Sequence, residues 1–231
     1  MKPVLINTTT ITMLPPAWLI KKINKVSCIS KWKILIAGLV LFILSIGTEV
    51  LSQNKKFIYK IIQGGDEVGF LTLAKKDSGL TTFLQMESEA KKRILFLITI
   101  YEKQSAVIEK GQVKYSSVYR KVNGSVKTNK CIHSTCCGYE LCKNGEKEKT
   151  NLTSIQHNQL TLYYEEPINY SQIYSDQFET MLPIEKTTTN HYKIELPDGN
   201  TNYYTYQNGV LTNIKIKHTF FSAEFILTKT E

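Results

Sequence analysis

Few of the residues and motifs that identify an enzyme are present in this 231-residue sequence. None of its four histidines, His133, His157, His191 and His218, belongs to an H-E-x-x-H metal motif. The sequence also lacks a G-x-S-x-G nucleophile motif and a glycine-rich phosphate loop. Because a nucleophile, a base and an orienting group cannot be assembled from the sequence, we expect no catalytic residues and no cofactor. A hydrolase is therefore the lowest-ranked of the functional hypotheses.

The acidic residues do not form a recognisable catalytic pair either. Glu165 and Glu166 are adjacent, and adjacent side chains diverge on helices and strands alike. Asp176 and Glu179 have no basic or nucleophilic partner that can be placed from the sequence. We therefore expect Asp176 and Glu179 to lie in a surface loop.

A basic stripe of the kind that binds nucleic acid is missing, although the net charge is +9. Residues 1–52 carry six lysines against one acid and so contribute +5. Residues 53–231 have 23 basic and 19 acidic side chains, which leaves an ordinary solubility charge. We expect no nucleic-acid partner, and the sequence contains no signal for an oligomeric state.

Only one long hydrophobic run occurs, "ILIAGLVLFILSIG" at residues 34–47, and it follows a lysine flank. This form is typical of a secretory signal, since a membrane span needs about 20 apolar residues. Extending the run to Leu51 admits Glu49 and gives a marginal span, so an uncleaved anchor is the alternative. The organisation expected is a leader without assigned fold at 1–33 and a signal peptide or anchor at 34–52. The remainder would be periplasmic or secreted, with membrane contact only through this segment.

From Lys56 onward the sequence has the pattern of a chain of β-hairpins. Asx-Gly pairs, the strongest local signal for two-residue hairpin turns, are flanked by strand-like residues. They occur at Asn123-Gly124, Asn144-Gly145, Asp198-Gly199 and Asn208-Gly209, with weaker turn signals at Gly64-Gly65, Asp77-Ser78-Gly79 and Lys110-Gly111. The fold class predicted is therefore mainly β, an antiparallel meander.

Most of the expected strands have one polar and one apolar face, but "ILFLITIY" at residues 94–101 is apolar on both. Its second face needs a cover, and residues 153–166 form a candidate helix that begins at a Thr/Ser N-cap and ends before Pro167. We predict a strongly curved sheet or incomplete barrel of about nine to eleven strands with one short helical insertion. With no internal repeat or linker, residues 53–231 form a single domain.

Four of the five cysteines lie in "KCIHSTCCGYELCK" at residues 130–143. If the hairpin turn is centred between Cys136 and Cys137, then Cys131 lies opposite Cys142. Cross-strand Cα atoms are about 4.5 to 5.5 Å apart, which a disulfide can span, and exported proteins tend to be oxidised. We predict a disulfide between Cys131 and Cys142 and leave Cys136 and Cys137 as unassigned thiols.

A zinc site is the competing interpretation of this segment, with the four cysteines as ligands or with His133 in place of one. Structural zinc sites usually present C-x2–4-C knuckles, and adjacent cysteines rarely reach one ion. A redox centre would need C-x-x-C at a helix N-terminus. We therefore expect no metal site.

Three segments resemble an uncharacterised family of exported proteins from Gram-negative bacteria of the Bacteroidetes kind. They are "GGDEVGFLTLAKK" (64–76), "LTLYYEEP" (160–167) and "LPDGNTNYYTYQNGVLTNIKI" (196–216), and the resemblance extends over roughly residues 56–228. It implies a predominantly antiparallel β domain behind a signal peptide and no catalytic residues. The cysteine hairpin departs from the family, which makes an essential metal site less probable.

Three functional hypotheses follow from these observations. The first is a periplasmic or cell-envelope binding protein whose curved sheet accommodates an apolar or amphipathic ligand, such as a lipid. The second is a structural or interaction module of the envelope without a small-molecule site. The third is a hydrolase.

Overall fold

The computed structural model describes residues 54–93, 97–218 and 221–231. The leader, the apolar run at 34–47, and Leu95 and Phe96 of the doubly apolar segment lie outside these residues. Val50–Glu231 forms a compact unit. This unit holds its own hydrophobic core and a continuous hydrogen-bonded sheet, which are the requirements for an independently folding domain.

Fifteen strands and one short 3₁₀ turn make up the described part of the chain. In order they are β1 (Asn54–Gln63), β2 (Asp66–Ser78), β3 (Thr81–Arg93), β4 (Leu97–Glu109), β5 (Gln112–Val122), β6 (Ser125–Thr135), β7 (Gly138–Lys143), β8 (Glu146–Lys149), η1 (Thr161–Tyr163), β9 (Gln172–Ser175), β10 (Thr180–Pro183), β11 (Glu185–Thr188), β12 (His191–Glu195), β13 (Thr201–Gln207), β14 (Val210–Lys217) and β15 (Ser222–Thr230).

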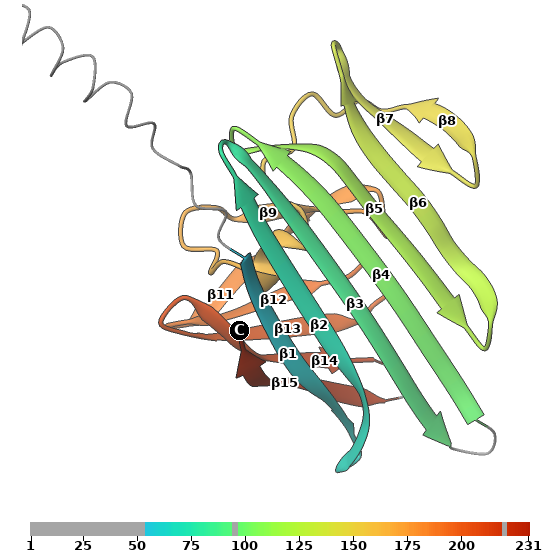
Figure 1. The fold of residues 1–231 in the computed structure, drawn as a ribbon, viewed down its shortest axis with the longest axis vertical. Coiled ribbons are helices and arrows are strands. Elements are labelled where there is room, and N and C mark those ends of the chain that lie inside the picture. The colour runs from blue at the N-terminus through green and yellow to red at the C-terminus, as the bar shows by residue number, and fades with distance from the viewer. Residues whose placement is uncertain (1–53, 94–96, 219–220) are drawn as a thin grey trace, which may run out of the picture. The chain divides into compact units, whose positions relative to one another are not determined.

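Thirteen of these strands form one antiparallel sheet, in the order β11-β12-β13-β14-β15-β1-β2-β3-β4-β5-β6-β7-β8. The last strand, β15, pairs with the first, β1, and so joins two meanders into one sheet. Figure 1 shows the long strands β2–β5 as one layer, with β11–β15 crossing behind them. The sheet is strongly curved and does not close, because β8 and β11 are its two edges. The predicted antiparallel, incompletely closed architecture is confirmed.

The turns follow the local chemistry of the sequence. The Asn123-Gly124, Asn144-Gly145 and Asn208-Gly209 pairs all have positive φ at both positions, as two-residue hairpin turns require. The φ angles of Lys110-Gly111 and Gly64-Gly65 are also positive at both positions. Asp198-Gly199 differs, since only Gly199 has a positive φ and the loop between β12 and β13 is longer.

The hydrophobic core lies between the two halves of the sheet and is completed by residues 150–184, which we call the insert. Leu160, Leu162, Ile173 and Leu182 of the insert pack against inward-facing side chains of both halves. Three buried tyrosine hydroxyls, those of Tyr59, Tyr139 and Tyr206, donate to main-chain carbonyls, which satisfies these polar groups in the interior. Tyr206, for example, donates to the carbonyl of Leu162 at 2.6 Å. The insert therefore fills the concave side of the sheet.

The insert contains less helix than the sequence predicted. The only regular helical part of residues 153–166 is the 3₁₀ turn Thr161–Tyr163, so the predicted helix over that range is wrong. The apolar residues Ile155, Leu160 and Leu162 are each fully buried, but their spacing does not form one helical stripe. No helix in the described part of the chain is long and apolar enough to cross a membrane.

Two further expectations differ from the structure. The strand count is higher than the nine to eleven expected, because short strands such as β8 and β11 extend the sheet at both edges. The insert does not cover the outer face of β4, where Leu97 is 51% exposed. Tyr101 on that face instead donates its hydroxyl to Glu87 at 2.8 Å.

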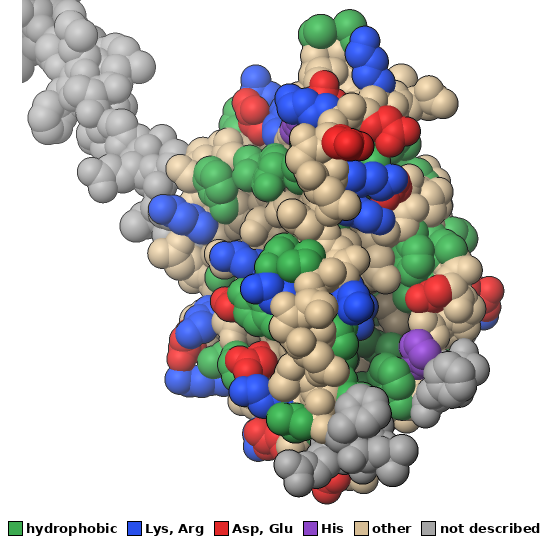
Figure 2. Space-filling view, turned by 90° about the vertical axis from the view of Figure 1, so that its right-hand side faces the viewer, with side chains coloured by type: hydrophobic (Ala, Val, Ile, Leu, Met, Phe, Trp, Pro, Cys, Tyr) green, Lys and Arg blue, Asp and Glu red, His purple; other side chains and the backbone are tan. Residues whose placement is uncertain are grey.

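The surface carries charges of both signs. Figure 2 shows basic and acidic side chains mixed with hydrophobic ones over the face seen there. Many of them are paired across strands, such as Lys60 with Glu67 at 2.8 Å and Lys215 with Glu224 at 2.7 Å. This mixed pattern agrees with the moderate charge of residues 53–231.

Candidate functional site

A cavity of about 200 Å³ lies between the two halves of the sheet, at the end that carries the β1–β2 turn and the β12–β13 loop. Side chains from β1–β5 face it from one side, and side chains from β13–β15 face it from the other. Gln159, Tyr163 and Gln177 of the insert also line it. Apolar cavities with a few convergent polar groups are the usual form of a ligand site.

One wall of the cavity is apolar. It includes Ile61, Leu71, Met86 and Phe225, which occupy inward-facing positions of their strands. Strand alternation explains this placement, because Leu71 is 2% exposed whereas its neighbour Phe70 on the other face is 49% exposed. This wall can bury an aliphatic or aromatic group.

One cluster of polar side chains in the cavity comes from β4 and β5. Glu102 and Arg120 are direct cross-strand neighbours, and the Arg120 Nε lies 3.8 Å from the Glu102 Oε2. Gln104 donates its Nε2 to the Glu102 Oε1 at 2.6 Å. The Arg120 Nε is buried and donates no hydrogen bond. The pair is electrically balanced, yet it keeps a free donor.

A second polar group comes from the start of β13. Asn200 and Asn202 are only 8% and 5% exposed, and the Oδ1 of each is buried without a hydrogen-bond donor. The Asn202 Nδ2 donates to the Tyr204 hydroxyl at 3.5 Å, and burial raises the pKa of Tyr204 to about 12. Burial also raises the pKa of Tyr163 well above its usual value. Buried polar atoms without partners are uncommon in folded proteins, and three of the six found in the described residues line this one cavity.

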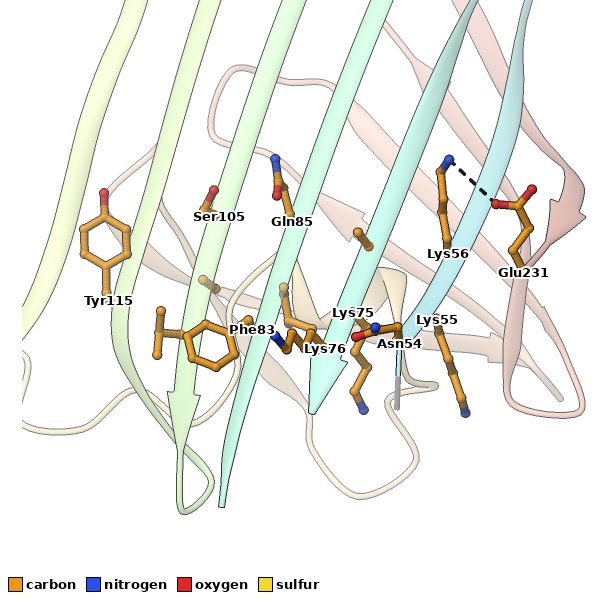
Figure 3. A pocket seen from close by; sticks show the side chains of 14 residues that line it. Asn54, Lys55, Lys56, Lys75, Lys76, Phe83, Gln85, Ser105, Tyr115 and Glu231 are labelled. Carbon is orange, nitrogen blue, oxygen red and sulfur yellow. Dashed lines mark ion pairs between the residues drawn. The ribbon is translucent and has the colours of Figure 1, made fainter. Parts of the chain in front are cut away.

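A second hollow, an open groove of about 580 Å³, lies on the outer face of β1–β5 (Figure 3). Its small lining residues Ala74 and Ser105 leave room between bulkier side chains. Phe83 and Tyr115, 43% and 38% exposed, lie along it, and Lys56 is paired with Glu231 at 3.7 Å at its end. Of the residues that the structure describes, none that lines the groove has a buried polar side-chain atom without a hydrogen-bond partner. We therefore place the candidate ligand site in the inner cavity.

The cysteine hairpin has the register expected from the sequence. Cys131 lies directly opposite Cys142 in the β6–β7 pair, which confirms the predicted turn. Both residues are free thiols in the structure, and burial raises the pKa of Cys131 to about 11. The disulfide itself stays a prediction. Cys136 and Cys137 are exposed in the turn, with their Sγ atoms 3.3 Å apart.

His133 lies beside these thiols on the outer face of β6. Its Nδ1 is 3.7 Å from the Cys142 Sγ, and its Nε2 is 3.2 Å from the Glu140 Oε1. Within the described ranges, no group of three or more His, Cys, Asp or Glu side chains is placed to hold a metal ion. His218 lines the inner cavity and stacks on Phe221, with 4.7 Å between the ring centroids.

Asp176 and Glu179 lie in a loop as expected, the β9–β10 turn, but the expected surface position is wrong for Asp176. Asp176 is 6% exposed, and its Oδ2 accepts hydrogen bonds from the Ser116 Oγ at 2.6 Å and the Asn158 Nδ2 at 3.5 Å. Burial raises the pKa of Asp176 to about 6. Glu179 pairs with Lys130 and with Lys143, both at 2.6 Å. These contacts attach the β9–β10 hairpin to the sheet.

Glu102, Arg120 and Asn202 of the cavity were not singled out in the sequence, although strand alternation contained a signal for them. Glu102 has the same inward parity as Gln104 and Ala106, and Arg120 has that of Val118. Asn202 has the parity of the buried Tyr204. A charged or amide side chain at an inward position is the informative exception to the pattern.

Comparison with known proteins finds a matching family and similar solved structures. Residues 59–228 match a family described as "Domain of unknown function (DUF6134)". A crystal structure of a β-barrel-like protein of domain of unknown function DUF1849 from Brucella abortus is similar in fold. That similarity has a TM-score of 0.52 at 13% sequence identity and covers 77% of this chain and 97% of the other. No curated protein matches the chain. The structural likeness supports the barrel-like architecture alone.

Proposed function

The chain belongs to the DUF6134 family, and from that premise we propose that it is a non-catalytic binding protein for a small apolar or amphipathic ligand. The ligand would occupy the inner cavity between the two halves of the sheet. The observation that carries the proposal is the combination of an apolar wall with three buried polar atoms that have no partner, on Arg120, Asn200 and Asn202.

Energetics support a ligand at these atoms. A buried donor or acceptor without a partner costs about 1–3 kcal/mol, and such groups are normally satisfied by protein or ordered water. A ligand that reaches the Arg120 Nε and the two amide oxygens would recover that free energy while its apolar part covers Leu71 and Met86. The site is therefore suited to recognition.

The protein would act outside the inner membrane, in the periplasm or after secretion. The lysine-flanked apolar run at 34–47 supports this, since it has the form of an export signal. A tether through an uncleaved run is the alternative. The proposal needs only that residues 50–231 reach an aqueous compartment where the ligand is present.

Native mass spectrometry tests the proposal. Residues 50–231 would be exported to a periplasm, purified without detergent and weighed under native and denaturing conditions. We expect a reproducible extra mass that is lost on denaturation. The Ala223→Phe variant adds a ring inside the cavity and should lose the extra mass, whereas Ser222→Phe adds the same ring on the other face and should keep it. A bare mass for the unaltered protein would refute a tightly bound ligand.

An interaction module of the cell envelope is the second candidate, and the outer groove favours it. Phe83 and Tyr115 are exposed there beside lysine side chains such as Lys76, a combination that suits contact with another macromolecule. A hydrolase is the last candidate, because the cavity gathers amides and a balanced Glu102–Arg120 pair, not a nucleophile with an adjacent base.

A further inference from the structure

We infer that the ligand of the inner cavity is an uncharged amphiphile, with a hydroxyl or a similar neutral polar group at one end of a short aliphatic chain. This inference rests on the proposed function and adds the chemical class of the ligand. It follows from three properties of the cavity, namely its charge balance, its free hydrogen-bonding atoms and its size.

The charge balance disfavours an ionic head group. The ionisable side chains that line the cavity are Glu102, Arg120, Tyr163, Asp198 and His218, and burial raises the pKa of Tyr163 so that its hydroxyl stays neutral. Glu102 and Arg120 neutralise each other at 3.8 Å, and Asp198 is exposed in the β12–β13 loop. A ligand carboxylate or ammonium would have to leave water without a free counter-charge inside, and this desolvation is costly.

The free atoms require a group that both donates and accepts. The Arg120 Nε needs an acceptor, whereas the Oδ1 atoms of Asn200 and Asn202 need donors. A carboxylate only accepts and would leave the amide oxygens unsatisfied, and an ammonium only donates and would leave Arg120 unsatisfied. A hydroxyl accepts from Arg120 and donates to one of the two amide oxygens, so it leaves fewer atoms unsatisfied than a carboxylate does. It leaves one atom unsatisfied, as an ammonium does, but it brings no charge into the cavity.

The volume sets the size of the ligand. A cavity of 150 Å³ holds a benzene molecule, so the 200 Å³ present here corresponds to about eight non-hydrogen atoms on the same scale. Suitable probes are 1-heptanol, heptanoate and heptylammonium, which share one chain and differ in the head group. A longer natural ligand would extend part of its chain out of the cavity.

Isothermal titration calorimetry at pH 7.5 with the three probes tests the inference. Residues 50–231 are first freed of any bound ligand by denaturation and refolding. We expect 1-heptanol to bind at least about tenfold more tightly than either ion. For heptanoate this is the factor expected for one further unsatisfied hydrogen-bonding group, and for heptylammonium it reflects the cost of burying its charge. Tighter binding of heptanoate or heptylammonium would overturn the inference and leave the proposed function standing. Binding of none of the three would overturn both, provided that native mass spectrometry also gives a bare mass.

A specificity switch gives a second and independent test. Asn202→Asp places a carboxylate in the cavity, and we expect it to reverse the order so that heptylammonium becomes the tightest probe. Asn213→Asp, the same charge change at a position on β14 that does not line the cavity, should leave the order unchanged. An unchanged order in a folded Asn202→Asp protein would contradict the placement of the head group at Asn202.

Discussion

Replacing the buried Asp176 by asparagine should stabilise the protein at neutral pH. The Oδ2 of Asp176 accepts hydrogen bonds from Ser116 and Asn158, which an asparagine oxygen can also accept. The Oδ1 has no partner and no cationic side chain of the described residues pairs with this carboxylate, so only the two hydrogen bonds to Oδ2 offset the desolvation of the ionised form. The substitution removes that charge and keeps the hydrogen bonds.

The magnitude follows from the raised pKa. Burial shifts the pKa of Asp176 from 3.8 to about 6 in the folded protein. The folded state therefore binds the proton more tightly than the unfolded state, and stability is highest below pH 3.8 and is lost as the pH rises to about 6. The loss amounts to about 3 kcal/mol. Because the new Nδ2 would lack an acceptor, we expect a net gain of about 1–2 kcal/mol for Asp176→Asn at pH 7.5.

Urea unfolding between pH 4 and pH 8, followed by circular dichroism, measures this effect. The difference in free energy of unfolding between Asp176→Asn and the unaltered protein should increase as the pH rises from 4 to 7. Taking the difference removes the opposite contribution of carboxylates whose pKa is lowered by lysine partners, such as Glu179. Asp198→Asn, at an exposed position, is the matched control and should show no such trend.

One result would refute the claim that the Asp176 charge destabilises the folded protein. If Asp176→Asn were less stable than the unaltered protein by 1 kcal/mol or more at pH 7.5, with no pH dependence in the difference, the carboxylate would be ionised and well stabilised in the folded state. The hydrogen bonds from Ser116 and Asn158 would then outweigh desolvation.

Three further predictions concern stability. Gly69→Ala should lower the free energy of unfolding by about 2–3 kcal/mol in urea titrations, because a Cβ there would lie 2.0 Å from the Glu89 carbonyl oxygen. An unchanged urea midpoint would contradict this. Tyr206→Phe should cost about 1–2 kcal/mol in the same assay, because it removes a buried hydrogen bond to the insert, and Tyr203→Phe on the other face is its control. After export, thiol labelling and mass analysis should find Cys131 and Cys142 joined, and their double serine variant should be less stable by about 2–3 kcal/mol; labelling of both without prior reduction would exclude the bond.

The features that the sequence predicted well depend on near neighbours in the chain. Asn-Gly pairs determine their own turn geometry, so Asn123-Gly124 and Asn208-Gly209 could be recognised without knowledge of the fold. The register of Cys131 with Cys142 followed from a short symmetric hairpin in the same way. Alternating strands then indicated a curved antiparallel sheet.

The features that could not be predicted depend on residues far apart in the chain. The partners of Asp176 are Ser116, 60 positions away, and Asn158, 18 positions away, so its burial left no local trace. The path of the insert is likewise determined by the concave surface that it fills and not by a periodicity of its own. The cavity combines the β4–β5 hairpin with β13, and these come to line one cavity only when the two meanders are joined.

The pairing of the last strand with the first has a consequence for how the chain folds. The hydroxyl of Thr228 in β15 reaches the carbonyl of Ile58 in β1, 170 positions earlier. During synthesis β1 therefore keeps one edge without its hydrogen-bonding partner until β15 has been made. Contacts of such high sequence separation slow folding, and an exposed strand edge invites association with other chains. We expect completion of the sheet to be a late and slow step, and a chain truncated before β15 to aggregate.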